Sequence, residues 1–262
     1  MIASSAAIAT LSWQGRLRVE RDVDAVAAVV AETLHRGLER RAVLGLATGR
    51  TMEPVYGALR SRLMALPQQQ RRSLLQGWRS FNLDEYVGLG PSQPSSFAAF
   101  MQQQLGIPLQ LEPGCLQVPD GLALQPDEEA QRYAAAVSAA GGIDLQLLGL
   151  GSNGHVGFNE PPCTPDAPCR SVELSQATRL QNACAFGGDP QAVPPRAITL
   201  GLSEILGARE LMLVVTGAAK AQILRRSLLE PPCSEVPASW LQAHSGLQVV
   251  VDQAATAGLV LS

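Results

Sequence analysis

The sequence predicts an α/β protein with a Rossmann-like, doubly wound, mostly parallel sheet and helices on both faces. Short apolar runs alternate with longer segments in which apolar residues recur at helical spacing. The run 143–150 ends at glycines and is followed at once by polar residues. Repeated strand–helix units favour a parallel sheet, whose ligands bind beyond the carboxyl ends of its strands. The length of 262 residues fits one domain, and we expect a single domain over 1–262.

The first elements follow from composition and spacing. The segment 17–20 is a short strand candidate, and 22–41 is an amphipathic helix with apolar residues at helical spacing. A second strand at 42–47 leads into a helix over 52–66. Pro67 and the glutamines after it interrupt the pattern, so we expect a break there.

The middle of the chain continues the alternation. A third strand is expected at 80–86 and a helix at 95–105. The segment 107–125 is rich in proline and glycine and predicts a connection with at most a short strand. A helix at 127–140, with Asp127 as a plausible N-cap, precedes the strand 143–150.

The last third begins with a long irregular stretch. Residues 161–195 carry many prolines and small residues, which predicts a loop, and long loops of this kind often act as lids. Further strand candidates at 197–205 and 210–216, a helix at 218–229 and a last strand at 247–251 complete the alternation.

Composition excludes several classes of function. A net charge of −3 argues against a nucleic-acid partner, because phosphate neutralisation needs a basic face. No apolar stretch reaches the roughly 20 residues that span a bilayer, and the segment 1–11 lacks a basic leader, so we expect a cytoplasmic protein without a membrane partner. Oligomeric state is not readable from the sequence.

Cysteine and histidine spacing predicts no metal and no cofactor. The five cysteines contain no Cys-x-x-Cys pair, and the three histidines lack the spacing of a metal-binding pair. The glycine signature of a dinucleotide site is absent from the first strand–helix unit.

Two strand–helix junctions resemble anion cradles. Thr48, Gly49, Arg50 and Thr51 place a glycine and two hydroxyls at a helix start, where N–H groups and the helix dipole attract anions. The second junction, Thr216 to Lys220, carries the only lysine of the chain. Together they favour a phosphorylated ligand. A plain helix cap at the first and a solvated lysine at the second are the alternatives.

Asp84 and Glu85 form a pair of carboxylates at the end of the third strand. Neighbours in a strand point to opposite faces, so the two predict different roles. One carboxylate in the ligand crevice suits a general base that removes a carbon-bound proton. Two surface acids in a loop are the alternative reading.

The glycine-rich loop after 143–150 carries the strongest signal for chemistry. Gly151, Asn153, His155 and Glu160 follow the strand within a few positions. Glycines let the backbone approach a ligand closely, and an imidazole beside a carboxylate suits acid–base chemistry. The alternative is a glycine-rich turn whose histidine only bonds the backbone.

Several motifs together resemble the glucosamine-6-phosphate deaminase family, which is related to the 6-phosphogluconolactonases. The most specific are Phe-Asn-Leu-Asp-Glu-Tyr at 81–86 and Gly-Ser-Asn-Gly-His-Val-Gly-Phe-Asn-Glu-Pro at 151–161. Further matching segments are 47–51, 195–199, 214–220 and 239–244, so the resemblance spans nearly the whole chain.

The resemblance implies a deaminase of hydrolase or isomerase type that converts glucosamine 6-phosphate to fructose 6-phosphate and ammonia without a cofactor. By this likeness His155, assisted by Asn153 and Glu160, opens the sugar ring. Asp84 then moves a proton from carbon 2 to carbon 1 through an enolamine. The expected substrate-binding residues are Thr48, Gly49, Arg50, Thr51, Glu85, Gly151 and Lys220.

One departure from the family concerns the phosphate. The family typically has an arginine where this chain has Cys184, and Arg50 or Arg179 could replace it. Three other readings stay open. They are a 6-phosphogluconolactonase-like hydrolase that needs His155 but not Asp84, a non-catalytic sugar-phosphate sensor, and Lys220 as a Schiff-base nucleophile.

Overall fold

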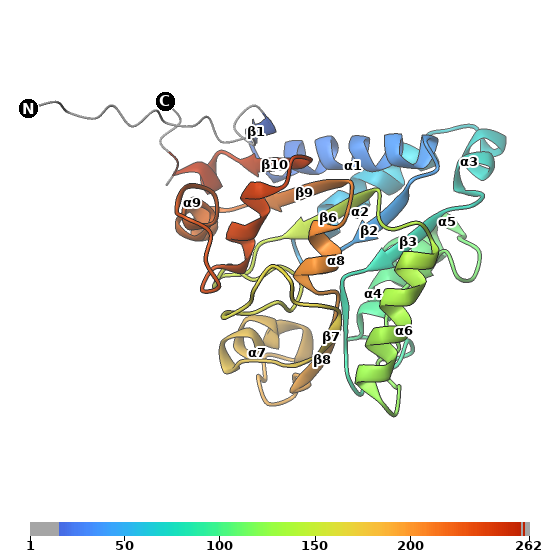
Figure 1. Cartoon of the computed structure of the whole chain (residues 1–262). Helices are drawn as coiled ribbons and strands as arrows, with labels where there is room; N and C mark the ends of the chain where they lie inside the picture. Colours follow the sequence, from blue (N-terminus) through green and yellow to red (C-terminus); the bar gives the residue numbers. More distant parts are fainter. Residues whose placement is uncertain (1–15, 258, 260–262) are drawn as a thin grey trace, which may run out of the picture.

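A seven-stranded parallel sheet forms the centre of the computed structural model, which describes residues 16–257 and 259 (Figure 1). The segment 1–11, expected not to be a leader, lies outside this range. In spatial order the strands are β1 (Leu17–Glu20), β10 (Leu247–Asp252), β9 (Glu210–Val215), β6 (Leu145–Gly149), β2 (Val43–Leu46), β3 (Arg79–Asn82) and β5 (Leu116–Gln117). All neighbours in this sheet pair in parallel, which confirms the predicted fold class.

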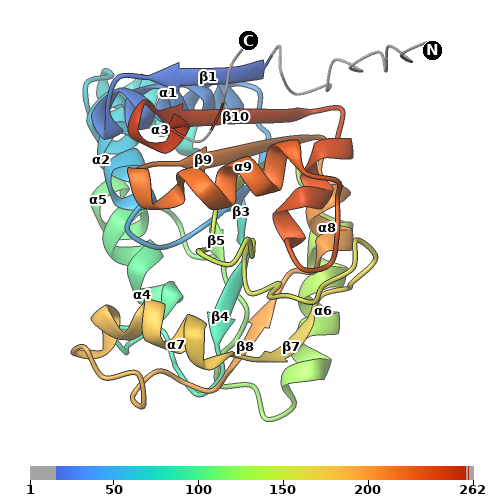
Figure 2. The same cartoon turned by 90° about the vertical axis from the view of Figure 1, so that its left-hand side faces the viewer.

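Helices cover both faces of this sheet. Figure 2 shows α9 in front of the strands and α1 and α2 behind them. The helices are α1 (Val23–Glu39), α2 (Met52–Met64), α3 (Gln68–Leu75), α4 (Phe97–Met101), α5 (Ile107–Leu109), α6 (Pro126–Ala139), α7 (Gln176–Asn182), α8 (Leu202–Leu206) and α9 (Ala221–Leu229). Tighter or wider helical turns lie at η2 (Gln102–Gly106), η3 (Ala183–Phe186), η4 (Ala218–Lys220), η5 (Pro237–Ala243) and η6 (Ala254–Thr256).

A second sheet, which the sequence did not predict, lies below the first in Figure 2. It contains β4 (Asp84–Tyr86), β8 (Arg196–Thr199) and β7 (Arg170–Glu173), all antiparallel. The strand expected at 80–86 is therefore wrong as one element. The chain changes sheets at Leu83, whose N–H donates to Leu46 O at the end of β2 and whose carbonyl accepts from Leu200 N.

Two further segments are more regular than the sequence pattern indicates. The glutamines after Pro67 form α3, because glutamine is a good helix former and proline is tolerated before the first helical turn. The stretch 161–195, expected to lack regular structure, contains β7, α7 and η3. Ser175 begins α7 by accepting a hydrogen bond from Thr178 N.

Two hydrophobic clusters hold these layers together. The larger contains the inner strands of the parallel sheet and the apolar faces of α1 and α2. The smaller lies under the second sheet and is built around Tyr86, whose ring centroid is 4.7 Å from that of Phe97 and 5.4 Å from that of Phe158. Phe158 thereby fixes the loop after β6 against β4. No helix in the described part of the chain is long and apolar enough to cross a membrane.

Candidate active site

Three of the predicted junctions meet at one edge of the parallel sheet. β2, β6 and β9 are neighbours, and the segments 48–51, 150–160 and 216–220 leave their carboxyl ends. In Figure 2 the segment after β6 runs between the large sheet and the three-stranded sheet. β4 starts at the same edge, because Leu83 is still bonded to the end of β2. The fold thus brings all four predicted segments together.

His155 is buried and held by its own loop. Its Nδ1 lies 2.6 Å from Asn153 Oδ1, and this contact assigns the ring proton to Nδ1, leaving Nε2 as the free acceptor. The backbone of Gly151 packs against the ring of His155, because a Cβ at position 151 would be 2.3 Å from Nε2. Burial lowers the pKa of His155 to about 4, with Lys220 adding to the effect and Glu160 opposing it. The imidazole is therefore neutral at pH 7.

Glu160 connects the histidine loop to α7. Its carboxylate accepts hydrogen bonds from Ser175 N at 2.8 Å and Ser175 Oγ at 2.7 Å, and from the Thr178 hydroxyl. The same carboxylate is close enough to His155 to favour its protonated form. Glu160 therefore supplies a negative charge beside the imidazole while its oxygens are fixed by the first turn of α7.

Arg50 and Lys220 form a pair of cations from adjacent junctions. Arg50 follows β2, Lys220 ends η4, and the positive charge of Arg50 adds to burial in lowering the pKa of Lys220. Among the described residues neither has a carboxylate partner. Thr51, at the start of α2, makes no side-chain cap bond, so its hydroxyl is free for a ligand. Two unpaired cations beside a helix N-terminus form a site suited to a dianion.

Asp84 faces the histidine loop from β4. A Cβ at Gly157 would lie 3.4 Å from Asp84 Oδ2 and 3.0 Å from Thr199 Oγ1, so the loop backbone passes directly over the carboxylate. Asp84 is only 5% exposed, and its carboxylate has no hydrogen-bond partner among the described residues. Burial, with a smaller contribution from the charge of Glu85, raises the pKa of Asp84 well above its usual value.

Glu85 is the one predicted residue that points away from the others. Its carboxylate accepts from its neighbour Tyr86 N and from Phe97 N and Ala98 N at the start of α4. It also lines a separate cavity of about 260 Å³ beside Asp120 and Gln102. These contacts tie β4 to α4, and substrate binding by Glu85 stays a prediction without a contact that supports it.

The structure adds residues that the sequence pattern did not single out. Asn159 donates to Val156 O and Leu200 O and accepts from Arg170, which fixes the turn between His155 and Glu160. Thr199 donates its hydroxyl to Leu200 O and accepts from Phe158 N. Both residues lie in segments that carry the family resemblance, Asn159 in the Phe-Asn-Glu-Pro motif and Thr199 in 195–199, although neither was predicted as a site residue.

Cys184, where the resemblance led us to expect an arginine, is an exposed thiol on η3. Arg179 is engaged elsewhere, because its guanidinium donates to Val193 O and Gln191 O. Of the two candidates to replace the arginine, only Arg50 lies beside Lys220. Among the described residues, no group of three His, Cys, Asp or Glu side chains could hold a metal ion.

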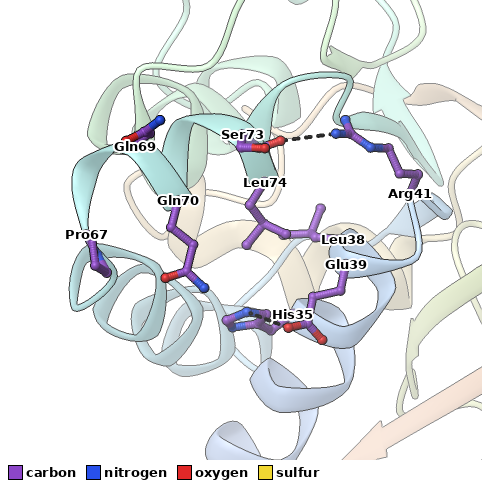
Figure 3. Close-up of a pocket in the computed structure, with 9 residues that line it drawn as sticks. All are labelled: His35, Leu38, Glu39, Arg41, Pro67, Gln69, Gln70, Ser73 and Leu74. Carbon is purple, nitrogen blue, oxygen red and sulfur yellow. Dashed lines mark hydrogen bonds and ion pairs between the residues drawn. The ribbon is translucent and has the colours of Figure 1, made fainter.

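A larger hollow of about 530 Å³ lies between α1 and α3, away from these residues (Figure 3). Leu38 and Leu74 form its apolar floor, and Arg41 donates across it to Ser73 O. It lies at the end of α1 that precedes β2 and so at the opposite edge of the sheet. It contains none of the predicted site residues.

The fold and the site define a class of protein, an α/β protein with an acid–base centre next to an anion site. The chain belongs to the family described as glucosamine-6-phosphate isomerases/6-phosphogluconolactonase, whose model matches residues 19–251. It is 42% identical to the glucosamine-6-phosphate deaminase of Rhodopirellula baltica over 230 residues, which cover 88% of each chain. It is 41% identical to that of Hahella chejuensis, over 94% of this chain and 92% of the other.

Solved structures agree with this placement. A monomeric glucosamine-6-phosphate deaminase superimposes with a TM-score of 0.86 at 33% identity, over 93% of this chain and 99% of the other. A 6-phosphogluconolactonase from Trypanosoma cruzi superimposes with a TM-score of 0.73 at 18% identity, over 94% and 97%. The second likeness shows the shared fold alone.

Proposed function

We propose that the protein is an enzyme that converts glucosamine 6-phosphate to fructose 6-phosphate and ammonia. The observation that carries this proposal is the meeting of a buried aspartate, a neutral histidine and two unpaired cations at one sheet edge. The deaminases to which the chain is about 40% identical support the same reaction. The family is described by its isomerase reaction, so we describe the protein as an isomerase-type deaminase in place of the expected label of hydrolase.

The phosphate group binds at Arg50 and Lys220. A sugar phosphate carries close to two negative charges at neutral pH, which matches two cations that repel each other in the empty site. The free hydroxyl of Thr51, with Thr48 and Gly49 in the same turn, adds hydrogen-bonding groups at the start of α2. Binding removes the repulsion between the cations, so it favours the phosphorylated sugar over the free amino sugar.

His155 opens the sugar ring. Its neutral Nε2 accepts the proton of the carbon 1 hydroxyl and delivers a proton to the ring oxygen as the bond between carbon 1 and that oxygen breaks. Asn153 holds the tautomer that leaves Nε2 free. The charge of Glu160 stabilises the imidazolium formed between the two transfers.

Asp84 carries out the isomerisation. It removes the proton from carbon 2 while the carbonyl oxygen at carbon 1 takes up a proton that the substrate's ammonium group gives up, which gives a neutral enolamine. Asp84 then returns its proton to carbon 1. The resulting iminium ion at carbon 2 adds water and expels ammonia. Burial of Asp84 makes it a stronger base than an exposed aspartate, which proton removal from carbon requires.

The segment 161–195 acts as a lid in this proposal. Its helix α7 contacts the site twice, through the bonds of Glu160 to Ser175 and through Gln181, which accepts a 2.7 Å hydrogen bond from Ser152 Oγ. Opening would release both contacts together and admit substrate. Closure excludes water from the enolamine.

A coupled assay tests the proposed reaction. Purified protein with millimolar glucosamine 6-phosphate is expected to release ammonia and fructose 6-phosphate in equal amounts, and Asp84→Asn to lower kcat by at least about 10³-fold. The lactonase alternative is tested with 6-phosphogluconolactone. Lactone hydrolysis that survives in Asp84→Asn, with no ammonia released by the unmodified protein, contradicts the proposal.

A further inference from the structure

Glu85 is a buried carboxylate that the proposed reaction does not use directly. It is 1% exposed and lies next to Asp84 in β4, with its side chain on the opposite face of the strand. Three backbone N–H groups donate to it: Tyr86 N at 2.8 Å, Phe97 N at 3.0 Å and Ala98 N at 2.8 Å. Two of these donors belong to the first turn of α4, so the start of this helix is fixed by the carboxylate of Glu85.

Asp84 and Glu85 differ in the hydrogen bonds that their carboxylates accept. Neither has a cation partner among the described residues, yet three donors stabilise a negative charge on Glu85 and no hydrogen bond stabilises one on Asp84. Burial still raises the pKa of Glu85 to about 7. The first negative charge of the pair therefore settles on Glu85, and it opposes a second charge on Asp84.

The other titratable groups packed against Asp84 and Glu85 do not change which of the two carboxylates takes the first negative charge. On the side of Asp84 is Tyr133, whose hydroxyl donates to Asn82 O and Gln117 O and stays neutral because burial raises its pKa. Tyr86 is neutral for the same reason. Beside Glu85, Asp120 lines the same cavity, and the nearby Glu129 is paired with Arg132. No described cation forms an ion pair with either carboxylate.

We propose that Glu85 is a positioning residue for the reaction, whose charge, held by the start of α4, keeps a proton on Asp84 to higher pH and so strengthens Asp84 as a base. The inference rests on the proposed function of Asp84. It assigns to Glu85 an action through Asp84 in place of the expected contact with substrate.

The pH dependence of kcat/KM tests this action. Asp84 works in its deprotonated form, so activity falls as pH drops through its titration. In Glu85→Gln the fall is expected at lower pH by about one unit, which is the effect of a unit charge roughly 10 Å away at an effective dielectric constant of about 20. Glu85→Asp keeps the negative charge, so kcat/KM is expected to fall at the same pH as in the unmodified protein. Ser96→Ala removes the hydroxyl that caps α4 at Ala99 N without changing charge, so its profile also stays in place.

Carboxyl ¹³C NMR of the unmodified protein tests the same inference without relying on activity. Glu85 is expected to titrate below Asp84, with the two signals assigned from Asp84→Asn and Glu85→Asp. Asp84 titrating first, or a Glu85→Gln profile that coincides with that of Ser96→Ala, overturns the inference. Absence of ammonia release with the expected titration order refutes the proposed function, whereas ammonia release with the reverse order refutes only the role of Glu85.

Discussion

Single side chains decide the chemistry at this sheet edge through burial more than through direct pairing. Burial favours the neutral form of both Asp84 and His155. It therefore raises the pKa of Asp84 and lowers the pKa of His155. Burial also lowers the pKa of Lys220, and the nearby positive charge of Arg50 adds to this shift. The sequence pattern singled out these four residues as candidates, since each lies near the end of an expected strand and carries a functional group. Strand alternation predicted different roles for Asp84 and Glu85, but it could not tell that Glu85 faces α4, because the face that each side chain occupies is set by a second sheet that the sequence did not predict.

Replacing Arg50 tests the phosphate site at the scale of one residue. Arg50→Ala is expected to raise KM for glucosamine 6-phosphate by tens-fold, about 2 kcal/mol for one charge-assisted hydrogen bond, with kcat changed little. Steady-state kinetics measures both constants. Arg36→Ala, at an exposed position of α1 paired with Glu32, is the matched control and leaves KM unchanged. A KM in Arg50→Ala equal to that of the control contradicts the assignment.

Gly151 tests the placement of the imidazole. A methyl group at this position meets the His155 ring at 2.3 Å, so Gly151→Ala displaces the ring and is expected to lower kcat by about 10²-fold. Gly57→Ala on α2 has no atom closer than 3.8 Å and is the control, with full activity and up to about 1 kcal/mol more stability. Equal kcat in both variants would show that the ring does not pack on Gly151.

At the scale of elements, the short strands and helices around the candidate site do more to position its side chains than the long helices do. The predicted strands of the large sheet and the longer helices are confirmed, because burial on both sides leaves a strong apolar pattern. β4 and β8 fall within the strands expected at 80–86 and 197–205, but the expectation missed the change of sheet at Leu83 and is wrong after Thr199, where the chain turns into α8. β7 lies in the stretch 161–195, whose prolines and small residues leave no clear periodicity. The same holds for α7, which begins at Ser175 within a stretch rich in proline.

The link between Glu160 and α7 gives an element-scale prediction. Thr178→Val keeps the shape of the side chain and removes the hydroxyl that donates to Glu160. We expect kcat to fall about tenfold while KM stays within twofold, because Glu160 acts on the histidine and not on the phosphate. Thr33→Val on α1, which removes a hydroxyl bonded to Val29 O, is the control. A loss confined to KM would contradict the role given to Glu160.

For the whole molecule, the buried histidine links stability to pH. Its pKa is about 4 in the folded protein and near 6.5 when unfolded, so the unfolded chain binds more protons between these values. The stability contributed by neutral His155 is present above pH 6.5 and is lost as pH falls toward 4, by up to about 3 kcal/mol. Urea unfolding at several pH values measures this. In His155→Gln the loss is expected to disappear, and a parallel dependence in both proteins contradicts the burial of a neutral ring.

One structure tests the central claim most directly, that a single amino sugar lies between the aspartate of β4 and the histidine loop. The Asp84→Asn variant, which holds substrate without turnover, is crystallised with glucosamine 6-phosphate. We predict that the phosphate contacts Arg50 and Lys220, that carbon 2 faces residue 84, and that the ring oxygen faces His155. A phosphate bound elsewhere, or a sugar that reaches only one of these two side chains, contradicts the account.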